Sequence, residues 1–160
     1  MKVPPASEEH LDALLAEEQR ELEGFIALLE REQAVLATGA IDQLQSVAEE
    51  KSGAFGRLAR AGRKRSEGLV RIGITGSAGT HAALAALPET SPVRRRWLAL
   101  RQSADRAQAL NHQNGALIRL RLTRNHQALA LLLSLSEQAA TYGPNGTAFA
   151  PPAARHIDIA

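Results

Sequence analysis

The side chains that could carry out chemistry are few and scattered along the chain. There is no cysteine, and the five histidines are His10, His81, His112, His126 and His156. His112 and His126 fall near one side of a helix, but fourteen helical residues span about 21 Å, too far for both to bind one metal ion. No HExxH, Ser/His/Asp or paired-acid arrangement accompanies them. The sequence therefore predicts no metal, no cofactor and no catalytic residue, and hence no enzyme.

Residues 73–79, GITGSAG, form the one glycine-rich stretch that invites a phosphate-loop interpretation. A Walker loop needs a lysine after its last glycine, and none is present. A nucleophile elbow needs a glycine two residues before Ser77, where this chain has Thr75. Both motifs fail, so we expect a flexible connection, followed by a short helix over 80–87 that Thr80 caps and Pro88 ends.

Bulk composition narrows the class of protein further. The 160 residues suffice for one domain, and the composition is 44% hydrophobic but only 3% aromatic, with leucine and alanine prominent, which favours helices. No stretch approaches the roughly 20 apolar residues of a membrane span, and the first residues lack a signal-peptide pattern. We expect a cytoplasmic, all-α protein without membrane insertion.

Two segments with heptad spacing predict an antiparallel helical hairpin. The first helix, 7–37, begins near Ser7 and ends before Gly39. Its expected seam is Leu11, Leu15, Glu18, Leu22, Phe25, Leu29, Glu32 and Leu36. The second helix, 41–72, has the expected seam Ile41, Leu44, Ala48, Lys51, Phe55, Leu58, Gly62, Arg65, Leu69 and Ile72.

The charged interruptions of the two seams should meet when the hairpin folds. A turn near residue 40 brings Glu32 near Lys51 and Glu18 near Arg65. Such pairs could specify the register, because a slipped alignment would set a charge against an apolar layer. Alternatively, the long side chains only reach out of the seam edge to water.

Net charge is strongly asymmetric along the chain. Residues 1–50 carry 12 acidic and 3 basic groups, whereas residues 51–130 carry 15 basic and 3 acidic groups. The simplest physical account places the acidic first helix beside the basic later helices, so that each screens the other. The basic half is then not all free for an outside partner.

A third long helix is predicted over 92–138, where Ser91-Pro92 supplies a strong start signal. This helix would be on the order of 70 Å long, more than the hairpin can cover, so part of it should project or be mobile. Residues 128–135, ALALLLSL, are apolar on nearly every face and must be covered. Either a partner covers them or a neighbouring helix or a second copy of the chain does.

Residues 139–160 are rich in Gly, Pro and Ala and should form a flexible tail. The predicted organisation is thus a helical bundle over 1–138 and a tail over 139–160. The fold class is all-α: an antiparallel hairpin plus a long C-terminal helix in a coiled-coil-like bundle, with a disordered tail.

Several of these residues also resemble a known family. The run LNHQNGALIRLRLTRNHQAL, 110–129, followed by TYGPNG, 141–146, is similar to the FlgN family of flagellar type III export chaperones, and AEEKS, 48–52, agrees with it. The closing Ile157 and Ile159 are similar to the family's tail end. The segment GITGSAGTHAALAALP matches no motif of that family.

The resemblance implies a cytoplasmic chaperone of hook-filament junction proteins (hook-associated proteins). It would bind their C-terminal segments, prevent premature assembly and deliver them to the cytoplasmic domain of the export gate. The client-binding residues that it implies on the long helix are Asn111, Asn114, Leu117, Ile118, Leu122, Asn125, Leu129, Leu132 and Leu133. For docking on the gate it implies Tyr142, Gly143 and Gly146. An asparagine in a helix seam can pair with a client or with the protein's own hairpin, and both alternatives stay open.

Two rival functions also fit parts of the sequence. A structural coiled-coil protein would use the long helices to self-associate, and the sequence leaves open whether the protein is a homodimer. A nucleic-acid binder would use the basic clusters 63–65, 94–96 and 119–124. It would lack stacking aromatics, and the acidic helix would neutralise much of its charge, so we expect no nucleic acid among the partners.

Overall fold

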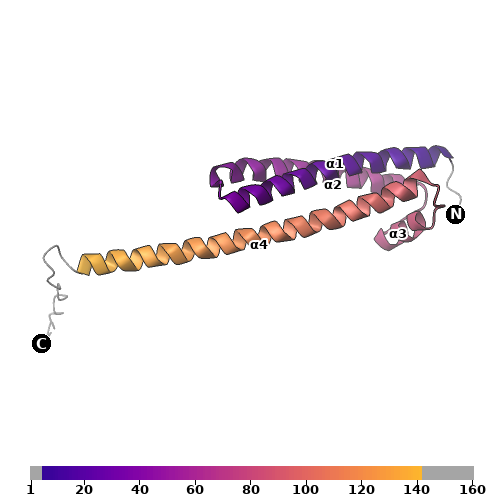
Figure 1. Cartoon of the computed structure of the whole chain (residues 1–160). Coiled ribbons are helices and arrows are strands. Elements are labelled where there is room, and N and C mark those ends of the chain that lie inside the picture. The colour runs from indigo at the N-terminus through magenta and orange to yellow at the C-terminus, as the bar shows by residue number, and fades with distance from the viewer. Residues whose placement is uncertain (1–4, 142–160) are drawn as a thin grey trace, which may run out of the picture. The chain divides into compact units, whose positions relative to one another are not determined.

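The computed structural model describes residues 5–141 and consists of four α-helices and one short 3-10 helix (Figure 1). In chain order these are α1 (Pro5–Thr38), η1 (Ile41–Gln43), α2 (Leu44–Arg71), α3 (Ser77–Ala85) and α4 (Pro92–Thr141). The described part of the chain contains no strand, which confirms the all-α prediction. The chain divides into two units, Met1–Ile118 and Arg119–Ala160, and each is described by itself.

The ends of the long helices lie close to the expected residues, with small differences. Helix α1 begins at Pro5 instead of near Ser7, because a proline fits the first turn, where its missing N–H has no partner to lose. It ends at Thr38, just before Gly39 as expected, and the φ of 82° at residue 39 favours glycine. Helix α4 continues to Thr141, past the predicted 138. The rest of the predicted tail lies outside the described residues.

The segment between α2 and α3 differs most from its prediction. Ile74 is buried in the core, so a loosely held linker is the wrong description of this stretch. Positive φ angles at Gly73 and Gly76 turn the chain, and α3 begins at Ser77 instead of residue 80. Thr80 does not cap it: the Thr80 hydroxyl donates to the Gly76 carbonyl oxygen at 2.8 Å, from inside the first turn.

Helices α1 and α2 run side by side (Figure 1). The predicted face of α1 is the one that is buried. Seven of the eight expected seam residues of α1 are buried, and the eighth, Phe25, is packed against the core. On α2 four of the five buried residues lie one position before an expected seam residue, whereas the fifth, Leu69, was itself expected. The buried residues of this helix are Val47, Ala54, Ala61, Gly68 and Leu69.

This shift has a steric cause. Four of the buried α2 residues recur at seven-residue intervals and are small, so the two backbones can approach closely. A Cβ added at Gly68 would lie 2.7 Å from Leu14 Cδ1, which shows how tight the contact is. The larger Phe55, expected in the seam, is displaced to the edge and is 61% exposed. Ile41, expected at the start of the same seam, is 60% exposed.

The predicted cross-hairpin ion pairs are present. Lys51 Nζ lies 2.6 Å from Glu32 Oε1, and Arg65 Nε lies 2.5 Å from Glu18 Oε2. The side chains of Glu32 and Glu18 are only 5% and 10% exposed, so these carboxylates do not reach out to water. A one-residue slip would move these buried carboxylates away from their cations, which favours the register interpretation over the alternative.

The first part of α4 completes the core of the Met1–Ile118 unit. Ser91 caps the helix as expected: its hydroxyl accepts from Arg94 N at 3.4 Å and donates to Glu8 at 2.6 Å. The side chains of α4 that are buried in this unit are Val93, Trp97, Leu100, Ala107 and Asn114. Arg96 forms two hydrogen bonds with Asp12 of α1, at 2.8 and 3.1 Å. The acidic first helix is thus screened by basic residues of both α2 and α4, as the charge asymmetry predicted.

Candidate functional site

Asn114 is the one predicted client-binding residue that the fold encloses. It is 1% exposed, and its Nδ2 donates to the Leu29 carbonyl oxygen at 2.8 Å and to Glu32 Oε2 at 2.9 Å. Glu32 in turn accepts from Lys51, so one polar layer joins α4, α1 and α2. The question that the sequence left open is therefore decided for this residue: the seam asparagine pairs with its own hairpin.

Three other predicted site residues lie nearby on α4. Asn111 is exposed and lines a surface hollow of about 350 Å³, together with Phe25 and Phe55. Leu117 is half-buried, and Ile118 is 36% exposed. This hollow is open to water and is lined by apolar and polar residues alike, and it is the place where Phe55 is displaced from the hairpin seam. The exposure of Phe55 was not predicted from the sequence, although the seven-residue spacing of small residues in α2 is a signal that could have indicated it.

Within the second unit, the predicted residues are exposed and most are leucines. Leu122, Leu129, Leu132 and Leu133 are 52%, 56%, 63% and 56% exposed. Leu120, Leu131 and Leu135, which were not among the predicted anchors, are exposed to a similar degree. Asn125 is also exposed. No side chain described between 119 and 137 is buried, so the described part of the chain does not cover this surface.

We call the exposed leucines of residues 119–137 the leucine surface. Contiguous apolar surface of this kind on one helix is typical of a protein-interaction site. Each leucine moved from water into a packed interface contributes about 1.5–3 kcal/mol. The predicted gate-docking residues Tyr142, Gly143 and Gly146 lie outside the described residues.

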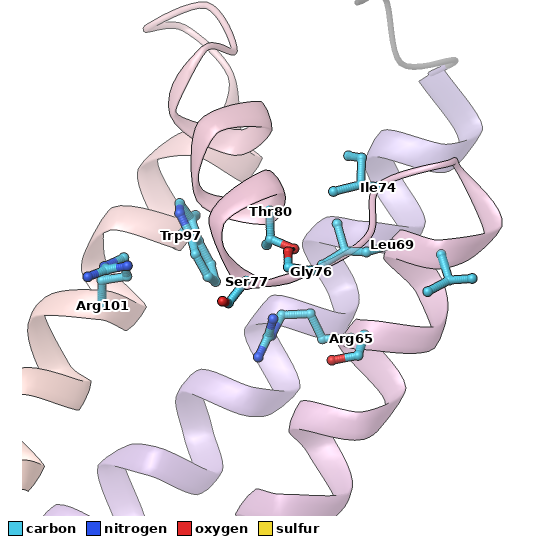
Figure 2. A pocket seen from close by; sticks show the side chains of 10 residues that line it. Arg65, Leu69, Ile74, Gly76, Ser77, Thr80, Trp97 and Arg101 are labelled. Carbon is cyan, nitrogen blue, oxygen red and sulfur yellow. The ribbon is translucent and has the colours of Figure 1, made fainter.

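The pocket drawn in Figure 2 lies between the end of α2, α3 and the first turns of α4, with a volume of about 320 Å³. The Arg65 guanidinium lies 5.4 Å from the centre of the Trp97 ring and also pairs with Glu18. Ser77 and Arg101 complete the polar lining. No general base lies beside the Ser77 hydroxyl among the residues lining this pocket, so the arrangement does not form a nucleophilic site. The side chains around this pocket instead connect α3 to α2 and α4.

Electrostatics at the hairpin surface consist mainly of neutralised pairs. Lys64 donates a 2.7 Å hydrogen bond that lowers the pKa of Glu17, and the hydrogen bonds to Asp12 raise the pKa of Arg96. Each of these pKa shifts favours the charged form of the group concerned, Glu17 or Arg96. Among residues 5–141 no group of three or more His, Asp or Glu side chains could hold a metal ion. Nor is any helix of that part of the chain both long and apolar enough to cross a membrane.

These features define a class of protein. It is all-α, its helical core contains a layer of buried hydrogen bonds and ion pairs, and it has an exposed leucine surface of the kind that binds other proteins. A family model described as "FlgN protein" matches residues 1–149. The chain therefore belongs to the FlgN family, a family of bacterial flagellar export chaperones and not of enzymes. Neither a curated protein nor a solved structure matches the chain significantly.

Proposed function

We propose that this protein is a cytoplasmic chaperone that holds the C-terminal segments of flagellar hook-filament junction proteins on its leucine surface. Bound there, a client segment would be kept from assembling early and would be delivered to the cytoplasmic domain of the export gate. The observation that carries the proposal is the exposure of seven leucines within residues 119–137 of a chain that belongs to the FlgN family. Contiguous apolar surface exposed to water usually marks a site of interaction with another molecule.

The test is titration calorimetry of the full chain with peptides from the C-terminal ends of hook-filament junction proteins. We expect binding, and we expect the triple variant Leu129→Ser, Leu132→Ser, Leu133→Ser to lose at least about 100-fold in affinity. The reason is that each leucine supplies more than 1.4 kcal/mol of apolar burial, about tenfold in affinity.

A matched triple variant controls for the general loss of apolar surface. Ile41, Val70 and Leu98 are 60%, 58% and 45% exposed and lie in the Met1–Ile118 unit. Their replacement by serine should leave client affinity within about twofold, because none lies on the leucine surface. If both triple variants bind like the unaltered protein, the proposed site is wrong. If the unaltered protein binds no client peptide, the proposed function is wrong.

A second prediction concerns Tyr142. We expect Tyr142→Ala to impair secretion of the clients while their affinity in calorimetry stays within about twofold, because an aromatic residue outside the client site suits transient docking on the gate. Secretion of junction proteins by cells carrying the variant measures delivery, and Tyr142→Phe serves as the conservative control. An equal loss of client binding and secretion would contradict separate roles for the tail and the leucine surface.

The rival functions receive less support from the described residues. A nucleic-acid binder needs free basic groups, yet Lys51, Arg57, Lys64, Arg65, Arg96 and Arg106 are paired with carboxylates of α1. A self-associating coiled coil would use the same leucines as the client. Light scattering over a range of protein concentrations separates these two functions. A self-associating coiled coil should form dimers as the concentration rises, whereas a chaperone should dimerise only weakly when a client segment occupies the same leucines.

A further inference from the structure

In the Met1–Ile118 unit, the contacts of α4 indicate which residue types pack against this helix. Part of the contact face of α4 packs on α1, whose buried residues include several leucines and whose charged residues are mostly glutamate or aspartate. Arg96 pairs with Asp12, Arg106 pairs with Glu30, and Asn114 donates to Glu32. The polar residues of α4 thus meet carboxylates of α1 at three places along the contact.

The same arrangement of residue types continues in the second unit. Arg121 follows the buried Asn114 by seven residues, and Arg124 follows the half-buried Leu117 by seven. Residues seven apart in an α-helix differ in direction by only about 20°, so both arginines belong to the side of the helix that Asn114 and Leu117 mark. Arg119, by contrast, follows the exposed His112 and belongs to the outer side.

Neither Arg121 nor Arg124 has a carboxylate partner among the described residues. In the Met1–Ile118 unit, Arg96 and Arg106 of the same helix are both paired. The described part of the second unit therefore presents an apolar surface together with two guanidinium groups that no described carboxylate pairs with, and the exposed amide of Asn125 lies in the same stretch. A guanidinium recognises a carboxylate with directed hydrogen bonds, which adds specificity to apolar burial.

We infer that the segment which covers the leucine surface is an acidic amphipathic helix, with leucine-like residues along its contact line and carboxylates that pair with Arg121 and Arg124. Its chemistry would match that of α1. The inference rests on the proposed function and adds the chemical character of the client segment to it.

Two other occupants fit the charges and the geometry less well. A second copy of residues 119–137 would bring the same arginines, and in a parallel pair these would repel one another. An anionic bilayer would attract the arginines, but a helix lying on a membrane needs one polar face. Leucines at 120, 122, 129, 131, 132, 133 and 135 leave no such face. A protein segment can enclose the helix on more than one side.

The experiment compares two synthetic helical peptides with the same leucine contact line, one with glutamates and the other with lysines beside it. Calorimetry uses the full chain at low and at high salt. We expect the glutamate peptide to bind at least about tenfold tighter at low salt, with a smaller advantage at high salt. The double variant Arg121→Gln, Arg124→Gln should lose that advantage, and Arg121→Glu, Arg124→Glu should reverse it.

Arg119→Gln is the matched control, because it removes the same charge from the outer side of the same helix and should leave the preference within about twofold. Circular dichroism checks that every variant keeps its helix content, which is expected because neither arginine is buried. Peptides from the clients are measured in parallel. The double glutamine variant should weaken their binding while Arg119→Gln does not.

The outcomes separate this inference from the proposed function. Equal affinity for both synthetic peptides, together with client binding that depends on the leucines alone, overturns the acidic-helix inference and leaves the chaperone function standing. Preference for phosphatidylglycerol vesicles over both peptides, or a dimer that forms through the leucine surface and excludes the glutamate peptide, also overturns it. If the glutamate peptide binds as expected but no client peptide does, the chaperone function fails instead.

Discussion

Replacing Lys51 with methionine is expected to reduce the free energy of unfolding of the helical bundle by about 3 kcal/mol. Lys51 pairs at 2.6 Å with Glu32, whose side chain is only 5% exposed. Removing one partner of a buried pair leaves an uncompensated charge and costs about 3–5 kcal/mol. We place the effect at the lower end because 24% of the Lys51 side chain is exposed and Asn114 still donates to Glu32.

Urea unfolding followed by circular dichroism measures this change. The matched control is Arg57→Met, which removes the partner of Glu21 at the surface, where an ion pair contributes about 0–1 kcal/mol. Adding Glu32→Gln to Lys51→Met should recover part of the loss, because it removes the unpaired charge and keeps an oxygen that accepts from Asn114. A loss for Lys51→Met no larger than that for Arg57→Met would show that the buried pair does not hold the hairpin together.

Leu15→Ala should be comparably destabilising, by about 2–5 kcal/mol, because Leu15 is 0% exposed at the centre of the contact between helices. The loss combines the transfer free energy of the side chain with the cavity left behind. Leu98→Ala, at a position that is 45% exposed, should change the free energy of unfolding by no more than about 0.5 kcal/mol.

The same substitution on the leucine surface should affect binding and not stability. Leu132→Ala, at a position that is 63% exposed, should leave the unfolding curve of the free protein unchanged and still weaken client binding. Leu15→Ala should instead destabilise the bundle and affect binding only where the protein unfolds. Destabilisation of the free protein by Leu132→Ala would indicate that this side chain is already covered in the absence of client.

The residues that stabilise the fold and the leucines that remain exposed therefore lie in different parts of the chain. Leucines of α1 and the small residues of α2 stabilise the hairpin, and the pairs of Glu18 and Glu32 favour one alignment over others. Leucines beyond Ile118 contribute little to the fold as described and remain available to a partner. Because the leucine surface is separate from the packed core, a segment that binds there and later leaves need not disturb the packing of the helical hairpin.

Much of the fold could be predicted from the sequence because heptad spacing and local end signals act over short distances. The leucine spacing of α1, the glycine at 39 and the Ser91-Pro92 start all identified elements close to their observed positions. The ion pairs of Glu18 and Glu32 followed from the turn position, since the place of the turn determines which residues of an antiparallel hairpin lie opposite one another. The run of leucines near residue 130 identified a surface that its own chain does not cover among the described residues.

Only the tertiary structure decided which face of α2 packs. Spacing alone favoured the line through Phe55, whereas Ala54, Ala61 and Gly68 allow closer backbone approach and so win the contact. It likewise decided that Asn114 pairs with the hairpin and that Ile74 anchors the segment before α3. Periodicity can be read from the sequence of one helix alone. Which of two adjacent faces packs depends on how the side chains of two helices fit together, and the sequence of one helix does not determine that fit.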